Sequence, residues 1–221
     1  MIRPHPLKAA GRALALVAAL ALSAPGLATP ALAASSLAPR DSDDFSRLVA
    51  QAEADDPATD FRALRYAWLT SAAKKRGGDT LTLTEKLIGA VRARKDKDVA
   101  AIARQIIAID YTDMRAHKYL RQACVILKDQ VCADHEHFVE FGLLKSIVGV
   151  GRDGKSLAGA WQVISIPEEY FIIEMVGMRS TQQSLMFDHD KPYDVLSVTG
   201  EDGKPLNLYF DIAAFYGHEL E

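Results

Sequence analysis

The chain has 221 residues, of which 49% are apolar and 25% are charged, which suits one globular unit or two small units that share a core. The net charge is −3, and no basic stripe with interleaved aromatic residues occurs, so the sequence excludes a nucleic-acid-binding protein.

The first 33 residues have the pattern of a secretory signal peptide. Three basic residues precede an apolar run of twelve (13–24), which is too short to span a bilayer as a mature helix. Residues 31–33, Ala-Leu-Ala, supply the small side chains of a cleavage site. We expect cleavage after Ala33 and no membrane attachment afterwards, with residues 34–42 as a linker. The alternative is a retained membrane anchor.

Cleavage would leave an acidic protein that contains both cysteines. The remaining chain has 23 Lys and Arg against 29 Asp and Glu, a net charge of −6, which opposes binding to anionic lipid. We therefore predict a periplasmic or secreted protein. In an oxidising compartment, two cysteines that can only pair with each other favour a disulfide between Cys124 and Cys132. The alternative is two small apolar side chains that pack separately.

Residues 43–150 have the apolar spacing that is typical of helices. We expect a short helix at Phe45–Val49 and a second helix that starts at Phe61 and stops at Gly77–Gly78. Further helices are expected at Leu83–Arg94 and Asp98–Ile109, and two more within Ala116–Gly154. We expect the last two to fold back on each other near Lys128. Ala34–Pro39 and the acidic pair before Phe45 mark the start of this part.

A repeat of 33 residues relates two of the expected helix pairs. Three apolar positions of the first pair recur in the second: Leu87 with Leu120, Ala90 with Ala123, and Ala100 with Ala133. A helix–turn–helix unit of this period resembles a degenerate tetratricopeptide repeat. Two copies are fewer than a free-standing array needs, so we expect these antiparallel helical hairpins to pack on the C-terminal part.

Residues 151–221 change to the alternation of strands. We predict an antiparallel meander of four to five strands, at Trp161–Ile166, Glu169–Val176, Ser180–Phe187, Tyr193–Thr199 and Leu206–Ala213. Strands without helices between them favour antiparallel pairing. The predicted fold class is therefore α+β, with TPR-like helical hairpins packed on a C-terminal sheet.

Several short motifs resemble one bacterial family. They are Asp60-Phe61 with Leu64-Arg65, Glu168-Glu169-Tyr170, Tyr193-Asp194 and Tyr209-Phe210-Asp211. Together they are similar to a family known only as a domain of unknown function, number 4919. The resemblance spans about Asp60–Gly217 and implies a fold but no known chemistry.

A phosphate-loop pattern occurs at Gly149–Ser156. Such a loop needs a strand before it and a helix after it, whereas here a helix precedes and a strand follows. We therefore interpret the stretch as the joint between helices and sheet and expect at least one of its glycines to have a positive φ. No cofactor is predicted.

A run of acidic residues and histidines suggests a metal site only weakly. His137 and Glu140 share a helix face, and His117 from the facing helix would be the third ligand. The alternative is the solvated, acidic start of a helix, whose dipole favours carboxylates. We predict no metal site.

Two functions stay open on the sequence. The first is a non-catalytic, exported binding or protein-interaction module. For this module we consider another envelope protein as the partner. The second is an exported hydrolase that uses carboxylates or histidines in a cleft between helices and sheet. Converging histidines and carboxylates in such a cleft would favour the hydrolase.

Overall fold

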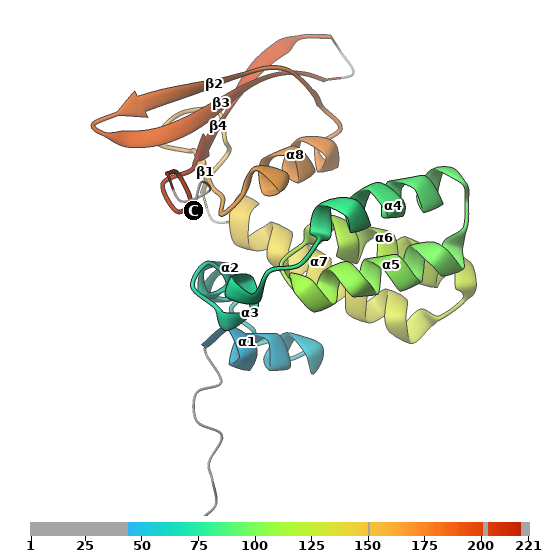
Figure 1. The fold of residues 1–221 in the computed structure, drawn as a ribbon. Coiled ribbons are helices and arrows are strands. Elements are labelled where there is room, and N and C mark those ends of the chain that lie inside the picture. Colours follow the sequence, from blue (N-terminus) through green and yellow to red (C-terminus); the bar gives the residue numbers. More distant parts are fainter. Residues whose placement is uncertain (1–43, 150, 201–202, 218–221) are drawn as a thin grey trace, which may run out of the picture. The chain divides into compact units, whose positions relative to one another are not determined.

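A computed structural model describes residues 44–149, 151–200 and 203–217, which belong to one unit that spans 39–221. Helices occupy the N-terminal two thirds of the described residues, and a four-stranded sheet follows (Figure 1). The predicted α+β class is therefore confirmed. The predicted signal peptide and the predicted linker lie outside the described residues and stay predictions.

The first helices are α1 (Asp44–Glu53), α2 (Phe61–Trp68) and α3 (Ala72–Arg76). Asp60 begins α2, because its side chain accepts the N–H of Ala63. The sequence predicts one continuous helix from Phe61 to Arg76, but the structure has two separate helices, α2 and α3, in this stretch. The Ser71 side chain accepts the N–H of Lys74 and starts a separate helix. Gly77, with φ of 64°, ends that helix as predicted.

Four longer helices follow, α4 (Thr80–Arg92), α5 (Asp96–Ile109), α6 (Met114–Leu127) and α7 (Gln130–Val148), and each packs on the next (Figure 1). Aspartate side chains begin three of them, at Asp79, Asp113 and Asp129. The six positions related by the 33-residue repeat are all buried in one apolar core that these helices share. The likeness to tetratricopeptide repeats itself stays a prediction.

The expected strand at Glu169–Val176 is wrong, because these residues form helix α8 (Ile166–Met175). Pro167 stands in the first turn, where its missing N–H costs nothing, and Glu168 and Glu169 favour the helix N-terminus. Gly177, with φ of 71°, follows the end of the helix. The apparent alternation came from a continuous apolar run, which suits a buried helix equally well.

The sheet contains β1 (Trp161–Gln162), β2 (Arg179–Asp188), β3 (Lys191–Thr199) and β4 (Pro205–Asp211) in the order β1-β4-β3-β2. Strands β2, β3 and β4 form the predicted antiparallel meander. The purely antiparallel arrangement is wrong, because β1 pairs with β4 in parallel. The chain between β1 and β4 contains α8 and the β2–β3 hairpin, which is long enough for the crossover that a parallel pair requires.

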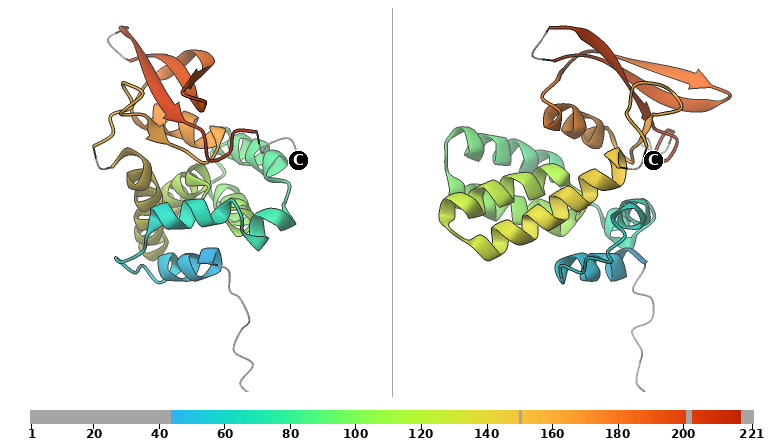
Figure 2. Two further views of the ribbon diagram at one scale, coloured as in Figure 1. Left: turned by 90° about the vertical axis from the view of Figure 1, so that its left-hand side faces the viewer. Right: turned by 180° about the vertical axis from the view of Figure 1, so that it is seen from behind.

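Helix α8 lies alongside the sheet in both views of Figure 2, and it contacts both β2 and α6. The largest apolar core draws residues from both sides of residue 150, including Leu64, Leu143, Phe171 and Phe210. The helical and β parts therefore share a core. None of the helices within the described ranges is both long and apolar enough to cross a bilayer.

Candidate functional site

A buried ion pair joins α2 to α8. Arg65, which is fully buried, donates from Nε to Oε1 of Glu168 at 2.6 Å and from Nη2 to Oε2 at 2.5 Å. The same carboxylate accepts the N–H of Ile164 at 2.8 Å, and Nη2 also donates to the carbonyl of Gln162 at 3.0 Å. Buried charges persist only when they are paired and hydrogen-bonded, so this cluster fixes α8 and β1 against α2.

Two further carboxylates of the family-like motifs are also bonded. Asp211 lies 2.7 Å from Nζ of Lys191 and accepts from Nε2 of Gln162 at 3.2 Å. The hydrogen bond to Asp211 is the main cause that raises the pKa of Lys191 above its ordinary value. Asp194 accepts from Nε2 of Gln183 at 2.6 Å. These contacts tie the strands together.

The remaining motif residues lie at other joints of the fold. The Tyr170 hydroxyl donates to Oε1 of Gln183 at 2.8 Å and so links α8 to β2. Tyr193 lies under the ammonium of Lys191, at 5.3 Å from the ring centre. Three more motif residues lie in α8 and β4. Glu169, in α8, is fully buried. In β4, the ring centre of Phe210 lies 5.6 Å from that of Trp161, and the Tyr209 N–H donates to the Gly154 carbonyl. The motif residues do not converge on one site.

The phosphate-loop pattern forms a joint, as predicted. Helix α7 ends at Val148, with Gly149 as its C-cap, and β1 follows after the loop. Gly151 and Gly154 have φ of 72° and 68°, which confirms the expected positive φ. The carbonyl of Gly154 accepts the N–H of Tyr209 at 2.7 Å, so this part of the loop is bonded to the sheet.

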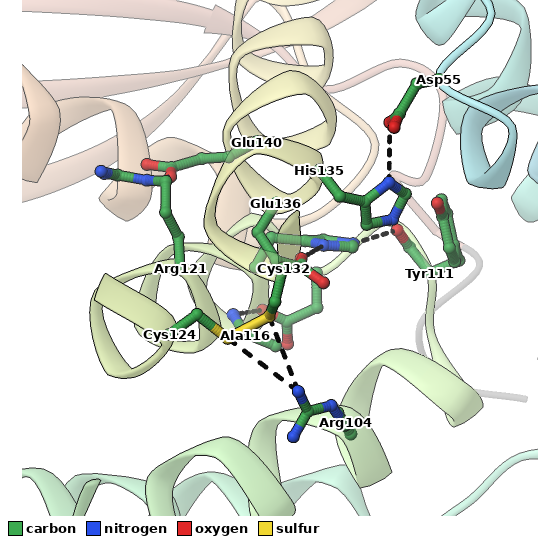
Figure 3. A network of polar contacts seen from close by, with 12 residues as sticks. Asp55, Arg104, Tyr111, Ala116, Arg121, Cys124, Cys132, His135, Glu136 and Glu140 are labelled. Carbon is green, nitrogen blue, oxygen red and sulfur yellow. Dashed lines mark hydrogen bonds and ion pairs between the residues drawn. A yellow bond between two sulfur atoms is a disulfide. The ribbon is translucent and has the colours of Figure 1, made fainter. Parts of the chain in front are cut away.

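Two of the weak metal candidates are engaged in contacts with other protein groups. Both ring nitrogens of His117 are bonded, Nδ1 with Oε2 of Glu136 at 2.5 Å and Nε2 with the carbonyl of Tyr111 at 2.9 Å. Glu140 accepts from Nε of Arg121 at 2.6 Å (Figure 3). These side chains are therefore engaged in links between α6 and α7.

His137, the third candidate, packs its ring 4.4 Å from the ring of Phe141. Within the described ranges, the group of three potential ligand atoms that lie within 4.8 Å of one another is Cys124, Asp129 and Cys132. This group includes none of the three residues that the sequence suggests as metal ligands. The Asp129 carboxylate in this group accepts the N–H of Cys132 as the cap of α7.

The two cysteines lie on either side of the α6–α7 turn. Their Sγ atoms are 2.08 Å apart, at covalent bonding distance, and their Cα atoms are 5.9 Å apart. Nη2 of Arg104, on α5, lies 3.6 Å from the sulfur of Cys132 and 3.9 Å from that of Cys124 (Figure 3). Bonded sulfurs do not ligate a metal as thiolates, so the geometry suits a structural role for the pair.

A cavity of about 360 Å³ opens between α4, the α5–α6 turn and the start of α8. One part of its lining is apolar and comprises Leu81, Leu87, Ile106, Met114, Ala116, Pro167 and Phe171. The other part carries hydroxyl and charged groups, namely Thr80, Thr84, Thr112, Ser165, Asp110, Asp113, Arg115 and Glu168. An apolar cavity with a few polar groups is the usual form of a ligand site.

Asp110 is the unusual residue of this cavity. It follows the last residue of α5, where the partial negative charge of the helix end disfavours a carboxylate. Its Oδ1 accepts the N–H of Thr112 at 2.8 Å and the Thr112 hydroxyl at 2.6 Å. Burial, reinforced by the charges of Asp113 and Glu168, nevertheless raises its pKa from 3.8 to about 6.

Sequence reasoning does not find this site. Asp110 and Thr112 follow a predicted helix in a pattern that indicates only a turn in which an aspartate bonds the backbone. The cavity brings Asp110 near Glu168, which is 58 positions later in the sequence. Strongly shifted carboxylates in cavities are typical of functional sites, so this cavity is the candidate functional site.

The family model described as a domain of unknown function, DUF4919, matches residues 72–219. Comparisons with curated proteins and with solved structures give no match. The matched stretch contains α3 to α8 and all four strands listed above, so it includes the cavity and the Glu168 half of the buried ion pair. The chain therefore belongs to the DUF4919 family, as its motifs predict.

Proposed function

We propose that the protein is an exported, non-catalytic binding module whose cavity receives a cationic side chain of another envelope protein. The observation that carries the proposal is Asp110, a carboxylate kept in a desolvated cavity wall at the unfavourable end of a helix. A group that costs stability where it stands is retained for function more readily than for folding.

The charges around the cavity favour a cation. The negative charge of Glu168 is neutralised by its ion pair with Arg65. The other charged residues of the lining are Asp110, Asp113 and Arg115, so the remaining net charge of the lining is negative. The apolar part of the lining suits the alkyl stem of a lysine or arginine, whose charged head would then reach the carboxylates.

The exported hydrolase is the second candidate, and one observation favours it. A carboxylate with a pKa of about 6 has the value that a general acid or base needs near neutral pH. Against it, the lining contains no histidine among the described residues, and the nearby Glu168 is held by a guanidinium. The binding module therefore accounts better for the groups present.

The binding proposal can be tested by NMR titration of the protein with two peptides that differ only in a lysine or its uncharged isostere norleucine. The lysine peptide should shift the resonances of cavity residues, and Asp110→Asn should abolish most of that shift. Asp134→Asn, an exposed carboxylate on α7 away from the cavity lining, is the matched control. Equal shifts from both peptides would refute a cation site.

The pH dependence follows from the same group. Asp110 becomes protonated as the pH falls through about 6, so the affinity for the lysine peptide should decrease there. A hydrolase would instead turn over a substrate and lose activity in Asp110→Asn. Turnover of ester or glycoside substrates that disappears in this variant would favour the second candidate over the first.

The partner class is tested in the cell that makes the protein. A photo-crosslinking residue in place of the exposed Leu81 at the cavity should capture an envelope protein, whereas the same residue in place of the exposed Val131 on α7 should not. N-terminal sequencing of the native protein should start at Ala34. A sequence that starts at Met1 would exclude the proposed export.

A further inference from the structure

Strand β2 is an open edge of the sheet. It pairs only with β3 among the described strands, so one row of its backbone N–H and C=O groups faces away from the sheet. Three apolar residues of this strand stay accessible: Leu185 is 48% exposed, Met186 37% and Phe187 52%. An edge with free backbone groups and accessible apolar side chains can accept a further strand.

Charged residues and prolines usually prevent an edge strand from pairing with another chain, and in β2 the charged residues stand only at its two ends. Residues 180–187 carry neither a charge nor a proline, and the charged residues of the strand are Arg179 at its start and Asp188 at its end. The opposite edge differs, because β1 has only two residues. Ten residues of β2 thus offer the longer surface for pairing.

We propose that two copies of this chain associate through β2, paired antiparallel about a two-fold axis at Ser184. Arg179 of each copy then faces Asp188 of the other copy. The proposal depends on no part of the cavity function, because the cavity is lined by α4, the α5–α6 turn and α8.

The register of β2 against β3 supports this pairing. Ser180 pairs with Val198 and Gln182 with Ser197, so Thr181 is an extra residue in a β-bulge. When that residue is left out of the count, Arg179 and Asp188 each lie four ladder positions from Ser184 and point to the same face of the sheet. A two-fold axis through Ser184 therefore brings them together without a change of face.

The charges are available for such a contact. Arg179 is exposed and has no ion-pair partner among the described residues. The Asp188 side chain is 45% exposed, and Nδ1 of the almost fully exposed His189 lies 3.0 Å from it. Parallel pairing would instead align like charges, so the charge pattern selects the antiparallel arrangement.

The apolar residues add to the interface. In the proposed register Leu185 faces Gln183 of the other copy, and the two Leu185 side chains are diagonal neighbours on one face, about 7–8 Å apart. Leu185→Lys would place two ammonium groups near each other at the centre of the interface. Inward-facing charges of this kind are how natural edges avoid pairing.

The test exchanges the two charges and measures self-association by analytical ultracentrifugation over a concentration series. Arg179→Asp or Asp188→Arg alone places like charges opposite each other twice, and each should weaken association about tenfold. An equimolar mixture of the two variants places opposite charges at both contacts and should restore association. The double variant should also restore it.

Lys97→Asp, on the exposed surface of α5, is the matched control and should associate like the natural chain. Leu185→Lys should be monomeric, with an unchanged circular dichroism spectrum. A natural chain that is monomeric at every concentration would overturn the proposal, even if β2 then captured a strand of another protein. A mixture that associates no better than its single variants would overturn it as well.

Discussion

At the scale of single residues, the carboxylates of this protein fall into two groups. Glu168 and Asp211 each lie within hydrogen-bonding distance of a cation, which offsets the cost of their burial. Among the described residues, the Asp110 side chain accepts only from the two donors of Thr112, and its pKa is raised. Desolvation therefore leaves this carboxylate easier to protonate in the folded state than in the unfolded chain.

This difference predicts how stability depends on pH. A group whose pKa rises from 3.8 to about 6 on folding contributes stability that is present below 3.8 and is lost as the pH rises through 6. Asp110→Asn removes the charge, so it should stabilise the protein at pH 7, by on the order of 3 kcal/mol. The gain should shrink towards pH 4. Urea unfolding of both proteins at several pH values measures the difference.

Thr112→Val provides the control for this prediction, because it removes one hydrogen bond that lowers the pKa of Asp110. The pH range over which stability changes should then move upward. A gain from Asp110→Asn that is equal at pH 4 and pH 7 would show that the carboxylate is not shifted.

At the scale of elements, two helix-interior glycines distinguish helix formation from helix packing. Gly89 of α4 has nothing within 4 Å of the position that a Cβ would occupy. The corresponding position at Gly142 of α7 lies 2.2 Å from the ring of Phe61, on α2. The first glycine therefore only weakens its helix, whereas the second allows α2 and α7 to approach closely.

Alanine at the two positions should act in opposite directions. Gly89→Ala should stabilise the protein by about 0.5–1 kcal/mol, because alanine has the higher helix propensity and meets no neighbour. Gly142→Ala gains the same propensity but forces the Phe61 ring out of its place, which typically costs about 1–3 kcal/mol. Thermal unfolding of both variants tests the pair. Stabilisation by Gly142→Ala would show that the α2–α7 contact is loose.

At the scale of the whole molecule, a shared core and one buried ion pair join the helical part to the sheet. The Arg65 guanidinium binds both carboxylate oxygens of Glu168. It also binds the backbone carbonyl of Gln162, the last residue of β1. Removal of one partner leaves the other buried without compensation. The ion pair is therefore a sensitive point of the fold.

Arg65→Met should destabilise the protein by about 3–5 kcal/mol, because Glu168 would be left charged and buried. The double variant Arg65→Met with Glu168→Met should lose less than Arg65→Met alone. Denaturant unfolding of the two single variants and the double variant gives the coupling energy. Additive losses would mean that the two side chains act independently.

The cysteine pair acts on the unfolded chain. A bond between residues eight positions apart closes a short loop, for which the chain-entropy estimate is about 2.5 kcal/mol. The native protein, unfolded without reductant, should show no thiol that reacts with a labelling reagent. Reduction should lower its stability by about that amount. Two reactive thiols per chain in protein taken from an oxidising compartment would exclude the disulfide.

The local features of this protein can be predicted from its amino-acid sequence. Apolar spacing located α4 to α7, because this signal is set within a few residues. Glycines marked the joint after α7, and short motifs identified the family. The same local signals failed at α8, where a continuous apolar run is compatible with either a buried strand or a buried helix.

The remaining features are set by the tertiary fold. It placed Arg65 against Glu168 across 103 positions of sequence, set β1 parallel to β4, and formed the cavity around Asp110. Ion pairing, strand pairing and desolvation all depend on which distant segments meet in space. No single segment of the sequence contains that information, because the pKa of Asp110 reflects neighbours that other elements bring to it.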